Sequence, residues 1–389
     1  MMNMSQRKIA IVTGTRAEWG LLCPIAKALA LRPDVKLTVL ATNMHLLEEY
    51  GHTVDDIVAD GFKPVEVDMG RPDGTALGSV KGMARCMEGM AEAFSEIKPD
   101  LVVILGDRYE MLAAASAALM CGIPIVHIAG GEISEGAVDD CIRHAITKMS
   151  ALHLTATEPY RKRVIAMGEN PALVINTGAI GIHNIRSVKL MDCRELSDSV
   201  GFDFSCPSFL VTYHPATLDP GDVAGRCRAL FRALDRFKDH NVLITYPNND
   251  PRGRIIIDEI EEYAASSPER VKVVPSLGMR RYLSAMQFVD AVVGNSSSGI
   301  VEVPSMGIPT VDIGIRQRGR IAAPSVIHCG DGEDEIAEAL ARAVSADMKA
   351  LASRKENPYE KPDTLQRIVD AIVSADIESL RVKRFYDIG

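Results

Sequence analysis

Residues 101–144 read LVVILGDRYEMLAAASAALMCGIPIVHIAGGEISEGAVDDCIRH. The apolar run Leu101–Leu105, stopped by Gly106, is typical of a strand buried on both faces of a parallel sheet. The alanine-rich segment Met111–Met120 predicts a helix packed close to that sheet, and Ile123–Ile128 predicts a second buried strand. Ligands of open α/β sheets bind outside the carboxyl ends of the strands. We therefore expect this stretch to form the floor of an active site.

Carboxylates follow both predicted strands. Asp107 and Arg108 come directly after the first strand, and Glu132 follows the glycine pair after the second. Asp139 and Asp140 come a few residues later. Several carboxylates at one edge of a sheet favour proton transfer, because each can take or give a proton at a bound ligand. Close carboxylates also raise one another's pKa, so that one of them could act as an acid at neutral pH.

Length and composition predict a two-domain protein of the ordinary globular kind. The chain has 389 residues, of which 47% are hydrophobic and 24% charged. Its net charge of −9, without a basic block, argues against nucleic acid as a partner. No apolar run reaches the roughly 18 residues of a membrane span, and the first residues lead into a strand without an export signal. We expect a cytoplasmic protein with no membrane partner.

The cysteines and histidines give no sign of a metal site. None of the eight cysteines forms a CxxC pair, and the nine histidines show no HExxH spacing. Free thiols in a reducing compartment explain the cysteines. We expect neither a structural nor a catalytic metal.

Strand and helix patterns alternate along the chain, from the buried strand Lys8–Val12 and the helix Leu21–Leu31 to a last amphipathic helix, Thr364–Ser379. The predicted elements between them include the strands Leu152–Thr155 and Val271–Val274 and a helix that begins at Val301. Such alternation predicts an α/β fold with parallel sheets and crossover helices. We place a linker at about residues 180–205 because the pattern there is irregular. The predicted domains are two Rossmann-like units facing a cleft. The first covers residues 1–182 and the second residues 183–361, and the helical segment 362–389 could cross back to the first.

The turn after the first strand, Thr13–Gly20, is a candidate anion site. Its glycines lack the GxGxxG spacing, which argues against a nicotinamide cofactor. Arg16 lies where backbone amides and a helix start favour an anion, so we expect it to bind phosphate or carboxylate. The alternative is a surface arginine on a tight turn. His45, after the next strand, is either a substrate contact or a helix cap.

A second candidate site is the segment Asn295–Glu302, NSSSGIVE. Serine hydroxyls and amide groups at a strand-to-helix turn suit a nucleotide diphosphate. Glu302, about one helical turn further on, can accept hydrogen bonds from a ribose diol. The alternative is a capped helix start. The predicted binding residues here are Asn295, Ser297, Ser298, Gly299 and Glu302.

Motifs over most of the chain carry a family resemblance. They read GTRAEWGLL, ATNMHL, LGDRYE, HIAGGEISEGAVDDCIRHAITKMS, TGAIGI, TYHP and GNSSSGIVEVPS. They resemble the hydrolysing UDP-N-acetylglucosamine 2-epimerases, in particular the branch that forms N-acetylmannosamine for sialic acid synthesis. The resemblance runs from about residue 8 to 360 and implies a glycosyltransferase-B-like fold, no metal, no cofactor and a homodimer or homotetramer. Ala129 departs from the pattern, since close relatives often carry histidine there, and so does the loop Met69–Thr75.

The resemblance implies a reaction and roles for the candidate residues. UDP leaves C1 as the C2 proton is removed, giving a 2-acetamidoglucal, and water then adds while a proton returns to the opposite face of C2. Proton transfer and activation of water fall to Asp107, Glu132, Asp139 and Asp140, and His214 would face the diphosphate or the glycosidic oxygen. Arg16 and Arg108 are candidate substrate contacts, and Arg143 and His144 match the family pattern as orienting residues.

Three alternatives to this reaction stay open. The substrate could be a UDP- or GDP-linked 2,4-diacetamido-6-deoxy sugar, as in legionaminic acid synthesis. The same fold could serve a glycosyltransferase that needs an acceptor. A nucleotide-sugar sensor without catalysis would need the serine turn and Glu302, but could dispense with Asp107 and Glu132.

Overall fold

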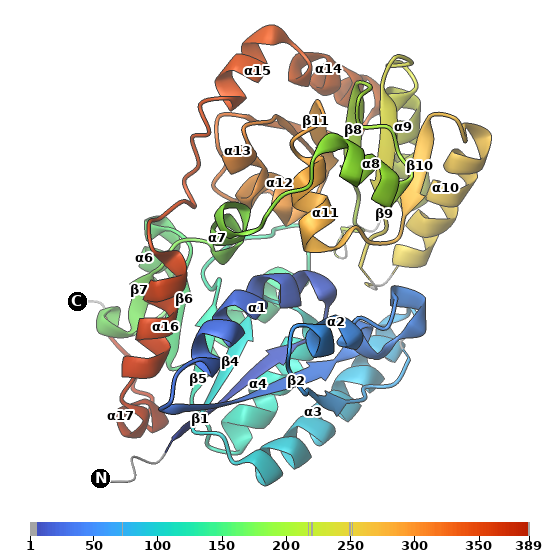
Figure 1. The fold of residues 1–389 in the computed structure, drawn as a ribbon. Coiled ribbons are helices and arrows are strands. Elements are labelled where there is room, and N and C mark those ends of the chain that lie inside the picture. Colours follow the sequence, from blue (N-terminus) through green and yellow to red (C-terminus); the bar gives the residue numbers. More distant parts are fainter. Residues whose placement is uncertain are drawn as a thin grey trace. The chain divides into compact units, whose positions relative to one another are not determined.

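The computed structural model of the chain describes residues 6–71, 73–216, 218, 221–248, 250 and 252–387. They form two compact units (Figure 1). Unit 1 comprises residues 1–132, 139–183 and 361–389, and unit 2 comprises residues 133–138 and 184–360. Each unit is a parallel sheet covered by helices, as predicted.

The sheet of unit 1 has seven parallel strands in the order β3-β2-β1-β4-β5-β6-β7. They are β1 (Arg7–Thr13), β2 (Val35–Thr42), β3 (Val65–Val67), β4 (Leu101–Leu105), β5 (Ile125–Ile128), β6 (Leu152–Thr155) and β7 (Val174–Asn176). The order of the strands reverses between β1 and β4, which is the position where sheets of this kind bind ligands.

Helices cover both faces of this sheet. Alternate side chains of β1, β2 and β4 pack against α1 (Arg16–Ala30) and α16 (Thr364–Ser374) on one face. On the other face the strands pack against α3 (Ala76–Ile97), α4 (Tyr109–Met120) and α5 (Asp139–Met149). The remaining helices of unit 1 are α2 (Val54–Ala59), α6 (Glu158–Ala166), α17 (Ile377–Arg381) and the 3-10 turns η1 (Asn43–Leu46), η2 (Glu48–Tyr50) and η3 (Pro171–Leu173). Helix α7 (Ile180–Ser187) begins in unit 1 and ends in unit 2.

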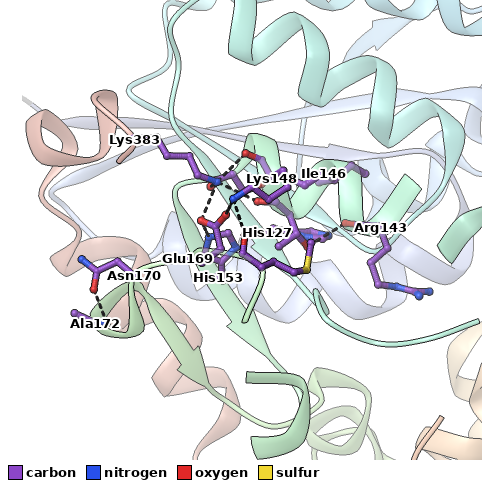
Figure 2. A network of polar contacts seen from close by, with 12 residues as sticks. His127, Arg143, Ile146, Lys148, His153, Glu169, Asn170, Ala172 and Lys383 are labelled. Carbon is purple, nitrogen blue, oxygen red and sulfur yellow. Dashed lines mark hydrogen bonds and ion pairs between the residues drawn. The ribbon is translucent and has the colours of Figure 1, made fainter. Parts of the chain in front are cut away.

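The carboxyl-terminal segment belongs to unit 1, which confirms that the last helix crosses back. A polar network around Glu169 holds Lys383, which follows the last helix, against unit 1 (Figure 2). The Glu169 carboxylate accepts hydrogen bonds from Lys148 at 2.5 Å and pairs with His153 and Lys383 at 3.0 and 2.8 Å. Lys383 also donates to the carbonyl oxygens of Lys148 and Ser150, each at 2.7 Å, at the end of α5.

Unit 2 repeats the architecture with six parallel strands in the order β10-β9-β8-β11-β12-β13. They are β8 (Ser208–Thr212), β9 (Asn241–Thr245), β10 (Val271–Val274), β11 (Ala291–Gly294), β12 (Thr310–Ile313) and β13 (Val326–Cys329). The helices are α8 (Cys193–Val200), α9 (Val223–Leu234), α10 (Gly253–Ser266), α11 (Gly278–Ala285), α12 (Ser297–Val301), α13 (Val303–Met306), α14 (Glu333–Ala343) and α15 (Ala346–Ala352). The strand order reverses between β8 and β11, so this unit too has a switch point.

Several predicted boundaries were wrong, each for a local reason. Helix α1 begins at Arg16 rather than Leu21, because Thr15 and Glu18 form a capping box. Helix α12 begins at Ser297 rather than near Val301, since Ser296 caps it. The last helix was predicted to be continuous but stops at Ser374, and Asp376 caps the short α17. Strand β13 and helix α15 had not been predicted.

Candidate functional site

The switch point of unit 1 brings the first two sequence motifs to one edge of the sheet. β1 ends at Thr13 and β4 at Leu105, and the two strands are neighbours. The turn that contains Arg16 and the residue Asp107 therefore follow adjacent strands. β5 lies next to β4 and leads toward Glu132. Both predicted groups lie where a doubly wound sheet accepts a ligand.

Arg143 connects the predicted carboxylates. Its guanidinium forms an ion pair with Asp107 and lies 3.4 Å from Oδ1 of Asp140. The same group donates to the carbonyl oxygen of Glu132 at 3.1 Å. Arg143 is only 1% exposed, whereas Asp107 and Asp140 keep 21% and 25% of their side-chain exposure. A buried cation thus holds two accessible carboxylates and the backbone beside a third.

Helix α5 makes this arrangement possible through its spacing. Asp140 and Arg143 are three residues apart, and His144 is one helical turn after Asp140, so all three share a face. Nε2 of His144 lies 3.6 Å from Asp140. Asp139 is the first residue of the helix and is half-buried.

The backbone around Glu132 is tightly constrained. Gly131 has φ +81, and a β-carbon there would lie 2.6 Å from the carbonyl oxygen of Tyr160, so only glycine fits. Arg163 donates to the carbonyl oxygen of Gly131. Ala129 adopts φ 66, a backbone conformation that is uncommon outside glycine. The Glu132 side chain is buried, at 5% exposure.

The amides of the glycine turn after β1 are already bound to a carboxyl group of the protein itself. The Glu18 carboxylate accepts hydrogen bonds from the amides of Gly14 and Thr15 at 2.7 and 3.2 Å. Burial and the nearby Glu110 raise the pKa of Glu18. Arg16 is the first residue of α1, and its Nε is 2.9 Å from Asp56. The guanidinium is half-exposed, whereas these amides are engaged internally.

Arg108 turns toward the protein interior. Its Nε donates to Oε1 of Glu110 at 2.7 Å, and both side chains are buried. The guanidinium also lies over the ring of Tyr109, 5.5 Å from its centroid. The positive charge of Arg108 therefore partly neutralises the carboxylate of Glu110, which lies against Gly14 in the turn that holds Glu18.

His45 is fully buried between two threonines. Its Nε2 lies 3.0 Å from the hydroxyl of Thr13, and its Nδ1 lies 2.8 Å from the hydroxyl of Thr53. Burial lowers the pKa of His45 to about 4, so the ring is neutral at physiological pH. In this structure the ring supports the end of β1 rather than facing solvent.

In unit 2, the side chain of Asn295 is bonded to the backbone of His214. The Asn295 amide accepts from the backbone N–H of His214 at 2.7 Å and donates to its carbonyl at 2.8 Å. The backbone N–H of Asn248 donates to Nδ1 of His214 at 3.3 Å. The proton of the neutral ring then lies on Nε2, which can donate to a ligand oxygen. Asn295 thus positions His214.

The serine turn combines a cap with accessible hydroxyls. Ser296 caps the amide of Ser298, so part of the turn is the capped helix start considered as the alternative. Ser297 is exposed and Ser298 is half-buried. Gly299 is buried, and a β-carbon there would lie 2.8 Å from Thr310, so it serves close packing against β12.

Glu302 lies beside a tyrosine that sequence reasoning did not identify. Burial raises the pKa of Tyr282 to about 12, with Ser298 and Glu302 acting on the same hydroxyl. No hydrogen bond of ordinary geometry to the Tyr282 hydroxyl occurs among the described residues. Sequence offered no signal for it, because Tyr282 comes from α11 and meets the serine turn only in the fold.

The arginines after β12 support the same turn. Arg316 and Gln317 donate to the carbonyl oxygen of Asn295 at 2.9 and 2.8 Å. Arg320 donates to the carbonyl oxygen of Ile133 at 3.2 Å, within the segment 133–138 that belongs to unit 2. The side chains of Arg316 and Arg320 thus hold backbone carbonyl oxygens of unit 2.

The predicted residues fall into two groups. Asp107, Asp140 and the backbone of Glu132 meet at Arg143, and His214, Asn295 and the serine turn lie together in unit 2. Arg16, Arg108 and His45 instead contact protein groups.

Within the described ranges no cluster of three histidine, cysteine or acidic side chains could hold a metal ion. In the same part of the chain, no helix has the length and apolar character that a membrane span requires.

Comparison with known proteins identifies the family. The family model described as UDP-N-acetylglucosamine 2-epimerase matches residues 27–373. The chain therefore belongs to the UDP-N-acetylglucosamine 2-epimerase family.

Individual relatives differ in the activities for which they are named. The GDP/UDP-N,N'-diacetylbacillosamine 2-epimerase (hydrolyzing) of Campylobacter jejuni is 37% identical over 326 residues, covering 83% of this chain and 84% of that protein. Polysialic acid biosynthesis protein P7 of Escherichia coli is 35% identical over 387 residues, covering 98% of each. The solved UDP-GlcNAc 2-epimerase from Neisseria meningitidis, bound to UDP-GlcNAc, aligns with a TM-score of 0.80 at 17% identity, covering 95% of this chain and 100% of that chain. This likeness confirms the predicted fold class, two glycosyltransferase-B-like α/β domains.

Proposed function

We propose that this protein is a hydrolysing 2-epimerase of a UDP-linked 2-acetamido sugar. The observation that carries the proposal is the set of contacts around Arg143, which gathers Asp107, Asp140 and the backbone of Glu132 in a member of an epimerase family. The substrate expected from the motifs is UDP-N-acetylglucosamine, giving N-acetylmannosamine and UDP, for sialic acid synthesis.

The two units divide the reaction between them. In unit 1, Asp107, Glu132, Asp139 and Asp140 take the proton from C2, activate water for C1 and return a proton to the opposite face of C2. Each proton transfer by a positioned group contributes about 10²–10⁴-fold in rate. Arg143 keeps Asp107 and Asp140 in place and takes no part in the proton transfers, because a guanidinium is not deprotonated in proteins.

Unit 2 binds UDP and assists its departure. Ser297 and Ser298 offer hydroxyls to the diphosphate, and Glu302 accepts hydrogen bonds from the ribose. His214 carries its proton on Nε2 and donates a hydrogen bond through it to an oxygen of the leaving diphosphate. Charge that develops on the leaving group is stabilised best by donors already held in position. The two hydrogen bonds between Asn295 and the backbone of His214 provide that rigidity.

A second substrate is favoured by one comparison. The relative from Campylobacter jejuni, 37% identical, is named for a diacetamido sugar linked to GDP or UDP. The departure from the family pattern at Ala129, three residues before Glu132 in the sequence, supports a difference around the sugar. The same elimination and hydration would then act on a 2,4-diacetamido-6-deoxy sugar.

The test is turnover of both nucleotide sugars without an acceptor or added metal. Release of UDP together with a free 2-epimerised sugar supports the proposal, and the faster substrate decides between the two sugars. UDP release only in the presence of an acceptor would instead indicate a glycosyltransferase. Binding without turnover of either sugar would indicate a sensor.

A further inference from the structure

His127 is a histidine of β5 that the reaction proposed above leaves unused. Its side chain is fully buried, in a strand with a neighbouring strand on each side. Burial lowers the pKa of His127 to about 3, so the ring is neutral at physiological pH. A neutral imidazole has one N–H donor and one acceptor nitrogen, so it can hold two different groups at once.

One nitrogen of the ring holds the end of β4. Nε2 of His127 lies 2.7 Å from the carbonyl oxygen of Gly106, the residue before Asp107. A carbonyl oxygen can only accept, so Nε2 carries the proton of the ring. The backbone N–H of Gly106 in turn donates to the carbonyl oxygen of Ile128 at 3.0 Å. Both polar backbone groups of Gly106 are therefore held by β5, and Asp107 follows from a fixed position.

The other nitrogen of the ring holds helix α5. Nδ1 of His127 lies 3.1 Å from the hydroxyl of Thr147, and the same hydroxyl donates to the carbonyl oxygen of Arg143 at 3.0 Å. His127 and Arg143 lie within one network of polar contacts (Figure 2). Arg143 also forms the ion pair with Asp107. The ring thus connects the strand end that precedes Asp107 to the helix that carries its partner.

The loop that leads to Glu132 passes close to the same two side chains. A β-carbon built at Gly130 would lie 3.0 Å from Nδ1 of His127 and 3.1 Å from the hydroxyl oxygen of Thr147. The contact between His127 and Thr147 therefore lies directly against the backbone that precedes Glu132.

We propose that His127 is a positioning residue, which sets the distance between Asp107 and Arg143 by holding Gly106 through Nε2 and Thr147 through Nδ1. The inference rests on the proposed function, because the groups that the ring holds are those assigned to proton transfer there. His127 acts through these groups and transfers no proton itself. A shift of a reacting group by about 1 Å can cost roughly 10²-fold in rate.

Two substitutions separate the two contacts of the ring. His127→Gln places an amide nitrogen near the position of Nε2 and keeps a donor for Gly106. His127→Asn places its amide near the position of Nδ1 and keeps only the contact with Thr147. The matched control is His153→Gln, since His153 is equally buried, lies opposite His127 on β6 and contacts Glu169 instead.

Turnover and UDP affinity are measured for all three variants, with turnover expressed per molecule that binds UDP in calorimetry. We expect kcat to fall about 100-fold in His127→Asn and about 10-fold in His127→Gln, with UDP affinity nearly unchanged. His153→Gln should keep kcat close to that of the parent protein. An equal loss in His153→Gln, or an unchanged kcat in His127→Asn, would overturn the positioning role.

A double-mutant cycle tests the contact with the helix. Thr147→Val removes the hydroxyl and keeps the shape of the side chain. It should lower kcat about 10-fold in the parent protein but cause little further loss in His127→Gln, which has already lost this contact. Losses that multiply would show that the two residues act independently and would overturn the link.

Two measurements without turnover separate this inference from the proposed function. Nitrogen NMR of the histidine rings should find the proton of His127 on Nε2. The amide of Gly106 should exchange several-fold faster in His127→Asn and at the parent rate in His153→Gln. A proton on Nδ1, or unchanged exchange at Gly106 in His127→Asn, overturns the contacts assigned to His127. A parent protein that releases no UDP from either nucleotide sugar overturns the proposed function, while the ring proton and the exchange rate still decide whether His127 holds these segments together.

Discussion

Arg143 forms an ion pair with Asp107, a residue that precedes it by 36 positions, and the same guanidinium holds Asp140 on its own helix. Both carboxylates remain partly exposed while the cation between them is buried. Such an arrangement fixes two acid/base groups relative to each other and to the backbone of Glu132. Predictions about the mechanism therefore begin with this arginine.

Arg143→Lys should lower kcat by about 100-fold, with a smaller effect on UDP affinity. Lysine keeps the positive charge but cannot hold two carboxylates and a carbonyl oxygen in one plane. Arg143→Met should in addition lower the free energy of unfolding by about 3 kcal/mol, because it removes one partner of a buried ion pair. Arg254→Lys is the control, since Arg254 forms an exposed ion pair with Asp258. Equal kcat for Arg143→Lys and the parent would separate the arginine from the reaction.

Glu132→Gln should retain UDP affinity and lose turnover, by about 10²–10⁴-fold for a group that transfers a proton. Glutamine keeps the shape and the hydrogen-bonding capacity of the buried side chain, so folding should be preserved. Calorimetry with UDP and a turnover assay measure the two effects separately. Unchanged turnover would remove Glu132 from the mechanism.

Glu302→Gln should weaken UDP binding about tenfold and leave kcat at saturation nearly unchanged, because the ribose contact would be made equally before and during the reaction. Glu338→Gln serves as the control, being an exposed carboxylate of α14 in the same unit. An equal loss of kcat and of UDP affinity would mean that Glu302 acts on the reacting sugar instead.

Stability should fall below about pH 6.5 because two buried histidines resist protonation. Burial lowers the pKa of His45 to about 4 and that of His127 to about 3. Below the ordinary value the unfolded chain takes up protons that the folded protein refuses, so acid favours unfolding. Each histidine contributes roughly 1.4 kcal/mol per pH unit in this range. Between pH 6.5 and 4, His45→Gln should reduce the slope of the free energy of unfolding against pH by the equivalent of one proton, as measured by urea unfolding. His52→Gln, at the surface, should leave the slope nearly as it is.

Lys383→Met should loosen the end of α5 that lies opposite the predicted catalytic residues. Lys383 donates to carbonyl oxygens of that helix and pairs with Glu169, as Figure 2 shows. We expect a loss of about 1–2 kcal/mol in the free energy of unfolding and faster amide exchange in residues 147–151. Lys349→Met, which removes a surface pair with Asp290, is the matched control. Equal exchange rates in the two variants would contradict the role given to this network.

The parallel sheets were predictable because they are buried on both faces. Leu101–Leu105, Leu152–Thr155 and Val271–Val274 were predicted with the bounds that the structure has. The start of α1 was missed because Thr15 and Glu18, which cap the helix, read as part of a glycine turn. The hydrophobic pattern of each segment thus predicted the helices and strands, whereas the capping residues determine where the helices begin.

The partners of the site residues were less predictable, since they come from distant parts of the chain. The interpretation of Arg143 as an orienting residue agrees with its contact to Asp140, but nothing local indicated the ion pair with Asp107. Likewise, Arg16 meets Asp56 and His45 lies between two threonines. Such contacts depend on how the strands are ordered, which composition and periodicity do not encode.

The most direct test of the proposed reaction is a proton NMR time course in D₂O. The purified protein is incubated with UDP-N-acetylglucosamine and, separately, with the UDP-linked diacetamido sugar, without added metal, nicotinamide or acceptor. We predict that UDP and a free 2-epimerised sugar appear together and that the product carries deuterium at C2. UDP release with an unexchanged C2 proton, or no release from either substrate, would contradict elimination and hydration as the reaction of this protein.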